Sequence, residues 1–192
     1  SGDVEAYGEQ PPAIGVDFFQ GPYIDPDDRD NPKYTPGDCS IIYSENEWDQ
    51  MAINGVNFGN NIVDDERFGM RRFVYHNNSG GIQGDPQIAP EYYNYLRGFW
   101  KDNSRMLYGG NAHFSSGAVG PECNFMFPGD TDPCNWGTIP PGTPPNGGYN
   151  QNGLYWTEEE AGNAPSDRRF MQSAGPFTLK SGAVHYITVG IP

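Results

Sequence analysis

The chain has 192 residues, the size of one domain, and carries a formal net charge of −14 with a pI near 4.3. A surface this acidic repels phosphate backbones and anionic lipid headgroups, which argues against nucleic acid as a partner. No apolar run is long enough to span a bilayer, which argues against membrane insertion. We therefore expect a single loop-rich domain over residues 1–192 that is directed neither at nucleic acid nor into a membrane.

The composition also limits the fold class. Glycine and proline are abundant, with 26 and 18 copies, and they are spread along the chain without a repeat period. Apolar residues make up only 35%, but aromatic residues reach 14%. A core of Phe, Tyr and Trp rings is therefore expected, rather than layers of aliphatic helices. The predicted fold class is mainly β with one or two short helices and extensive ordered loops.

The predicted elements begin with a short strand at residues 14–19, inside an acidic, turn-rich segment that extends to residue 40. A short helix is expected at 45–51 and a strand at 68–75. The clearest helix is predicted at 90–101, because Pro90 suits a first helical turn. Large apolar side chains then fall at helical spacing on one broad face: Tyr92, Tyr93, Leu96, Phe99 and Trp100. Core packing is the expected role of this stripe, and a ligand platform is the alternative.

The second half of the chain reads as turns followed by strands. A brief strand is expected at 124–127, and a Pro/Gly/Asn-rich loop at 139–152. The C-terminal stretch predicts antiparallel β structure, with strands at 170–173, 177–179 and 184–189. The last of these is apolar on both faces, as expected of a strand packed between layers.

Three cysteines leave more than one pairing open. Cys123 and Cys134 close a short loop whose Pro-Gly pair can turn the chain back, so a disulfide between them is expected. It would indicate an oxidising compartment. Cys39 would then be a buried thiol, would pair outside the chain, or would displace one of the other two.

Acidic loops make calcium the expected cofactor, because calcium is held by several oxygen ligands from a flexible loop. The densest set of oxygen ligands lies at residues 25–31. The predicted metal ligands are Asp25, Asp27, Asp30 and Asn31. A second candidate loop spans residues 57–66, and Asp130 with Asp132 forms a third. None of them fits the EF-hand pattern, and an acidic solvated surface without metal is the alternative.

The sequence contains no catalytic residue and no cofactor-binding motif that we can identify. Cysteine and histidine lack zinc spacing, no G-x-S-x-G is present, and the closeness of His113 and Ser115 in sequence does not establish a triad. A glycoside hydrolase is a distant alternative, with Trp156 beside three glutamates or Trp100 near Asp102. The same aromatic residues, if exposed, suit a carbohydrate-binding module, which is the second hypothesis.

Several strings of the chain together resemble a segment of large secreted Bacteroidetes proteins that are exported by the type IX secretion system. They are ERFGMRRF at 66–73, EYYNYLRG at 91–98, YGGN at 108–111, FPGDTDP at 127–133, DRRF at 167–170 and SAGPF at 173–177. The resemblance covers most of residues 14–192 and implies an extracellular or outer-surface location. It carries over no catalytic residue. This chain lacks the C-terminal sorting domain of such proteins, so we expect a fragment of a longer protein.

The expected function is that of a non-catalytic extracellular module, structural or adhesive, in a secreted cell-surface protein and stabilised by calcium. Its expected partners are other segments of the parent protein or cell-surface components, and the apolar strand edge at 184–191 could pair with a neighbouring segment. Glycans are the partners expected under the carbohydrate-binding alternative.

Overall fold

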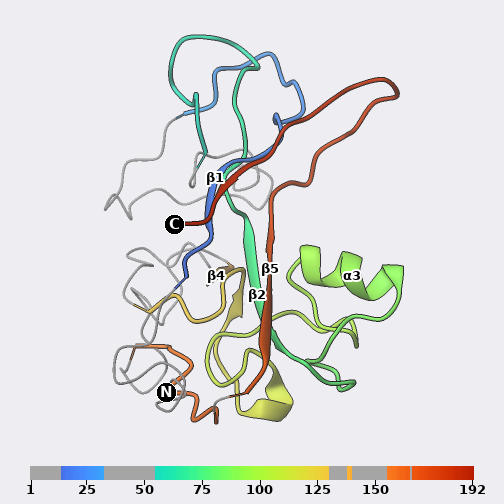
Figure 1. Cartoon of the computed structure of the whole chain (residues 1–192). Helices are drawn as coiled ribbons and strands as arrows, with labels where there is room; N and C mark the ends of the chain where they lie inside the picture. The colour runs from blue at the N-terminus through green and yellow to red at the C-terminus, as the bar shows by residue number, and fades with distance from the viewer. Residues whose placement is uncertain (1–13, 33–54, 130–137, 140–154, 165) are drawn as a thin grey trace.

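The computed structural model describes residues 14–32, 55–129, 138–139, 155–164 and 166–192, and all structural statements concern these residues. The described chain is mainly β with one short α-helix, a 3-10 turn and long loops, as the composition predicts (Figure 1). In chain order the elements are β1 (Asp17–Gln20), β2 (Arg72–Asn77), α3 (Ala89–Leu96), η1 (Phe114–Ser116), β3 (Glu122–Cys123), β4 (Thr138–Ile139), β5 (Arg168–Ser173) and β6 (Thr188–Gly190).

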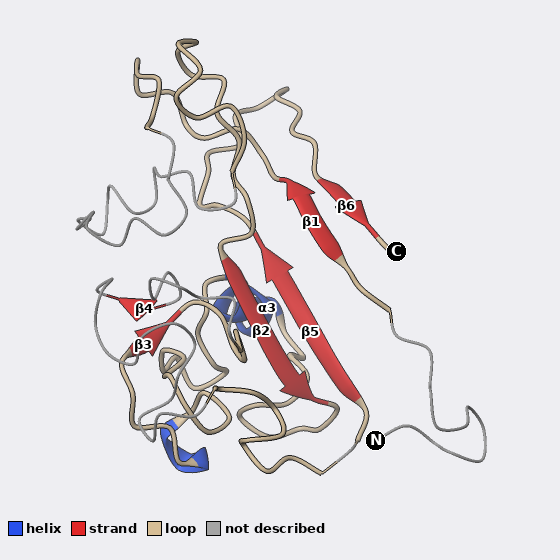
Figure 2. Cartoon of the chain, turned by 90° about the vertical axis from the view of Figure 1, so that its left-hand side faces the viewer, coloured by secondary structure: helices blue, strands red, loops and turns tan. Residues whose placement is uncertain are grey.

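The described strands form three separate antiparallel pairs, β1 with β6, β2 with β5, and β3 with β4. The longest pair joins β2 and β5, in which Arg72 lies opposite Ser173 and Asn77 lies opposite Arg168. Figure 2 shows these two strands side by side through the middle of the molecule, with the β1–β6 pair beyond one end of them. The predicted strand at 170–173 is confirmed as part of β5, which pairs with β2 across a long sequence separation, whereas the strand predicted at 177–179 is wrong because no strand forms there.

The larger hydrophobic core packs around the β2–β5 pair, and four of its nine buried residues are aromatic, in line with the composition. The side chains of Trp100 and Trp156 are fully buried in it. The other buried members are Val74, Tyr95, Met106, Tyr108, Ala112, Cys123 and Met126. Both indoles also bond to backbone, with Trp100 Nε1 donating to the carbonyl of Ala112 and Trp156 Nε1 donating to that of Gly110. Because both indole N–H groups have acceptors, burying these rings leaves no indole donor unsatisfied.

The helix α3 begins where the sequence indicates, but it is shorter than predicted and buries a different set of side chains. Pro90 lies in its first turn, and the helix ends at Leu96 because Gly98 adopts a left-handed φ of 73°. Its buried side chains are Asn94 and Tyr95. The expected core stripe is therefore wrong for Tyr92, Tyr93 and Leu96, which are 49%, 60% and 44% exposed. Asn94 is buried because its amide nitrogen donates to the carbonyl of Trp100 and so fixes the loop that follows the helix.

A second, smaller core lies beyond the Arg72–Ser173 end of the β2–β5 pair, the end near β1 and β6, where long loops meet. Ile24, Phe58 and Phe68 form it, with Ala174 and Phe177 packed against them. Arg67 fastens this region, because its guanidinium bonds the carbonyls of Gly21 and Tyr186 while its backbone pairs with Val56. Segments from three distant parts of the chain therefore meet at one residue.

The predicted C-terminal strand is shorter and more exposed than the apolar pattern indicates. Only Thr188–Gly190 pairs, with β1. The side chains of Val184, Tyr186, Ile187 and Val189 are all more than half exposed, so the expected packing between layers is wrong. The predicted helix at 45–51 lies outside the described residues, as does nearly all of the loop at 139–152. No described helix has the length and apolar character needed to cross a bilayer.

Candidate functional site

Two of the acidic loops that the sequence singles out lie against each other and form an acidic double loop of residues 25–31 and 57–66. The carboxylate of Asp64 accepts hydrogen bonds from the backbone N–H groups of Asp27 and Asp28, at 2.8 and 3.0 Å. In the opposite direction, Asp30 accepts from the backbone N–H groups of Gly59 (2.7 Å), Asn60 (3.3 Å) and Asn61 (2.6 Å). The two loops therefore fasten each other through carboxylates that bond to backbone amides.

The other two predicted ligands also bond to protein atoms. Asn31 is buried, and its N–H donates to the buried carboxylate of Glu66 at 2.5 Å, while its side-chain amide donates to Asp27 at 3.2 Å. Asp25 points elsewhere and accepts from the backbone N–H and the hydroxyl of Thr178, at 2.7 and 2.6 Å. The hydroxyl bond from Thr178 lowers the pKa of Asp25 below its usual value.

These contacts decide how well the double loop fits a calcium ion. A calcium site needs six to eight oxygen atoms around one point. Among the described residues, no group of three or more His, Cys, Asp or Glu side chains is placed to hold a metal ion. The side chains of Asp27, Asp30 and Asn31 make contacts within the double loop, whereas the carboxylate of Asp25 bonds Thr178 of the C-terminal loop. Calcium at these four residues stays a prediction, and Asp130, Asp132, Cys39 and Cys134 lie outside the described residues.

A hollow of about 360 Å³ opens between β5, the loop before α3, and α3 itself, and we name it the α3–β5 pocket. Its lining is mostly polar and includes His76, Asp85, Gln87, Tyr92, Arg169 and Phe170. The β2–β5 register places Arg169 opposite His76, so both side chains point to the face of the pair that α3 covers. Sequence reasoning missed this site because its residues come from three distant segments.

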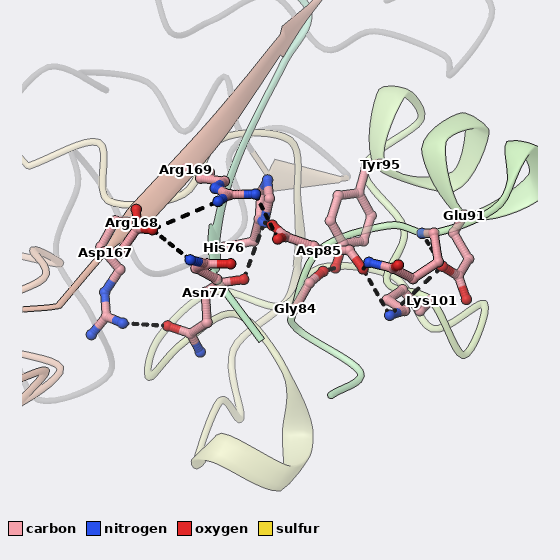
Figure 3. Close-up of polar contacts among 12 residues, drawn as sticks. His76, Asn77, Gly84, Asp85, Glu91, Tyr95, Lys101, Asp167, Arg168 and Arg169 are labelled. Atoms are coloured by element: carbon pink, nitrogen blue, oxygen red, sulfur yellow. Dashed lines mark hydrogen bonds and ion pairs between the residues drawn. The ribbon is translucent and has the colours of Figure 1, made fainter. Parts of the chain in front are cut away.

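The charged side chains beside the pocket are held in a connected network of internal contacts (Figure 3). Arg169 Nη1 lies 2.6 Å from Asp85 Oδ2, and Arg169 Nη2 lies 3.6 Å from Asp167. Lys101 donates to the backbone carbonyl of Asp85 at 2.9 Å and lies 3.6 Å from Glu91. Each cation of this network therefore has a carboxylate or carbonyl partner in the protein, which fixes the shape of the pocket before any ligand arrives.

Burial determines the protonation behaviour of the two rings beneath the network. Desolvation lowers the pKa of His76, against the opposing influence of Asp85, whose Oδ1 lies 3.3 Å from the imidazole Nδ1. Desolvation also raises the pKa of Tyr95, whose hydroxyl donates to the carbonyl of Gly84 at 2.5 Å. Both groups are therefore neutral around pH 7, and they act as parts of the frame.

One group of residues has the side-chain types of a hydrolase triad. His113 Nε2 lies 3.1 Å from Asp102 Oδ2, and His113 Nδ1 lies 2.6 Å from the hydroxyl of Ser115. The same Nδ1 accepts the backbone N–H of Ser115 at 3.2 Å and so caps η1. A neutral imidazole has one acceptor nitrogen, and here that nitrogen serves the cap. The ring is also 1% exposed. The arrangement therefore stabilises the turn at η1.

The aromatic platforms that the glycoside hydrolase alternative requires are not available at the residues named for it. Trp100 and Trp156 are both fully buried, so neither indole can stack on a sugar. Glu158, one of the glutamates beside Trp156, forms an ion pair with Arg168 at 3.2 Å. Exposed aromatic rings are found elsewhere, and two of them, Tyr92 and Tyr93 on α3, are residues that the sequence assigned to the core.

Comparisons with known proteins add no relationship. No family model matches the chain, and neither a curated protein nor a solved structure matches it.

Proposed function

We propose that this chain is a non-catalytic extracellular module of a secreted cell-surface protein, and that it acts in adhesion by binding a ligand in the α3–β5 pocket. The observation that carries the proposal is the pocket itself. It is open and polar, and its charged residues are fixed by partners within the protein. A site that is formed before binding loses little conformational entropy when a ligand enters.

The charges of the pocket support binding rather than hydrolysis. Glycoside hydrolysis needs two carboxyl groups on opposite sides of the bond that is cut. Asp85 supplies the carboxylate among the lining residues, and its Oδ2 is bonded to Arg169. Asp167 and Glu91 lie in the surrounding network and are bonded within it. One carboxylate among the described lining residues does not make the pair that such hydrolysis needs.

Location, partners and calcium belong to the same proposal. The strings shared with type IX secreted proteins support a location outside the cell. The partners proposed are cell-surface components or other segments of the parent protein. Calcium at Asp25, Asp27, Asp30 and Asn31 is proposed as a stabiliser of the loops and not as a part of the pocket, which is lined by other residues.

The proposal is tested by measuring whether the chain holds beads on a surface. Microbeads coated with the full chain are washed under flow over bacterial cells and over a mucin-coated surface, beside beads coated with albumin. We expect the chain to retain beads on at least one surface, and we expect Arg169→Ala to reduce retention while Arg29→Ala, an exposed arginine of the acidic double loop, leaves it unchanged. Retention no better than that of albumin beads would contradict the proposal.

A further inference from the structure

We propose that the α3–β5 pocket binds an uncharged saccharide, with a sugar ring stacked on Tyr92 and its hydroxyls bonded by Arg169 and Gln87. The inference rests on the proposed function and names the ligand class. The hollow, at about 360 Å³, lies at the small end of the range for small-molecule sites. That volume suits a monosaccharide or disaccharide unit and leaves no room for a folded partner.

Tyr92 supplies the stacking surface. Its side chain borders the pocket and is 49% exposed, although the helical spacing favours burial. An exposed tyrosine ring offers rigid apolar area at low entropic cost, together with a hydroxyl for hydrogen bonding. Phe170 also borders the pocket, but its ring stacks on Phe73 with centroids 5.7 Å apart. The β2–β5 register places both phenylalanines on the face opposite Arg169, so Tyr92 is the ring that faces a ligand.

Arg169 and Gln87 supply the polar contacts. The Asp85 carboxylate holds the Arg169 guanidinium at 2.6 Å, and that side chain is still 49% exposed, so its remaining N–H groups can donate to ligand hydroxyls. Gln87 is exposed and donates its amide nitrogen to the carbonyl of Asp85 at 3.1 Å. This bond directs the amide and leaves its oxygen as an acceptor. Asp85 is a positioning residue, because it fixes both side chains.

The charge balance selects an uncharged ligand. Arg169 lies between two carboxylates, Asp85 and Asp167, and Lys101 lies beside Glu91. These five side chains sum to one negative charge, and the chain as a whole carries −14. An anionic ligand such as a uronic acid or a sulfated sugar would therefore meet repulsion that the paired arginine does not offset. Neutral hydroxyls replace water at the same donors and acceptors without that repulsion.

The experiment uses the full chain on an array of neutral gluco-, galacto-, manno- and xylo-oligosaccharides, with uronic acid and sulfated oligosaccharides on the same surface. Binding to the best neutral oligosaccharide is then measured by calorimetry. We expect a neutral series to bind. Tyr92→Ala should weaken the binding at least tenfold, which corresponds to about 1.4 kcal/mol, and Tyr92→Phe should weaken it less because the ring is kept.

The matched control is Tyr93→Ala, which removes the neighbouring ring of the same helix. Tyr93 is 60% exposed and packs against the Arg97 guanidinium, 5.3 Å from its ring centroid, away from the pocket lining. We expect a change below twofold. Equal losses from Tyr92→Ala and Tyr93→Ala, binding to the acidic sugars alone, or no binding on the array would each overturn the inference. If the beads still adhere in that case, the proposed function stands with another ligand, whereas loss of bead adhesion would remove both.

Discussion

The two cores of this chain are held together by different means. Around β2 and β5, fully buried aromatic rings pack against one another, and the polar atoms of the indoles bond to backbone carbonyls. The smaller core has three buried apolar side chains, and carboxylates of the acidic double loop bond backbone amides beside it. Apolar burial contributes in proportion to area, whereas each exposed hydrogen bond contributes little net free energy. The first region should therefore set the global stability, and the second should open more easily.

The largest expected effect comes from the first region. Trp100→Ala removes a fully buried indole and its bond to Ala112, and we expect it to lower the free energy of unfolding by about 3–5 kcal/mol. Urea denaturation followed by circular dichroism measures the change. Phe19→Ala is the control, because Phe19 is 57% exposed, and it should change stability by less than about 1 kcal/mol. Similar losses in the two variants would show that the aromatic core does not dominate.

Calcium tests the second region. If the predicted ligands bind it, excess calcium should raise the thermal midpoint over that in chelator, and at a hundredfold excess over Kd the stabilisation is about 2.7 kcal/mol. Asp30→Asn should abolish the rise, because it removes charge while keeping an oxygen for the loop amides. The melt is run under non-reducing conditions. An unchanged midpoint would contradict the calcium hypothesis. The carboxylates would then serve to hydrogen-bond one loop to the other.

A smaller effect is expected from removing one of the carboxylates that bond the two parts of the acidic double loop together. Asp30→Ala removes the acceptor for the N–H groups of Gly59, Asn60 and Asn61, and we expect a loss of about 1–2 kcal/mol. Native-state hydrogen exchange should show faster exchange at 59–61 and little change in β2. Equal acceleration in β2 would show that the regions unfold as one unit. Asp28→Asn is the control, because Asp28 is exposed, serves as donor through its backbone and has a left-handed φ of 60° that asparagine tolerates.

The smallest expected effect is the loss of stability as pH falls. Here the first region, around β2 and β5, should lose stability at a higher pH than the second. The pKa of His76 is lowered by burial, so the unfolded chain binds more protons, and stability falls as pH drops below about 6.5. The pKa of Asp25 is also lowered, so its contribution is present above the usual aspartate range and is lost only at lower pH. Between pH 7 and 5, His76→Gln should flatten the stability profile and Asp25→Asn should not. Calorimetric melts across this range measure both, and identical profiles for wild type and His76→Gln would contradict the assignment.

Local sequence signals predict much of the fold. Pro90 and Gly98 bracket the helix, and the Phe, Val and Tyr residues of 68–75 indicate the strand that becomes β2 at Arg72–Asn77. The aromatic face of the helix could not be read in the same way, because rings lie on both sides of it. Burial of Asn94 depends on a loop carbonyl that only the folded chain brings near. The inward side of α3 therefore follows from tertiary contacts.

The site illustrates the same limit. The sequence identifies acidic loops one at a time, and each reads as a calcium candidate because its oxygen atoms are dense. Folding brings two such loops together and places backbone amides against the oxygen atoms. The α3–β5 pocket gives no local signal at all, since His76, Asp85, Tyr92 and Arg169 are ordinary residues in their own segments. Only the pairing of β2 with β5 assembles them.

The long separation of paired segments bears on the order in which the chain can fold. Arg67 bonds both Gly21 and Tyr186, and β1 pairs with β6. If the chain emerges from its amino end, the smaller core lacks its last contacts until residues near 190 have appeared. The larger core waits in the same way for β5. Both cores therefore stay incomplete until the carboxyl-end segments are made, so most of the chain must remain unfolded until its synthesis is nearly finished.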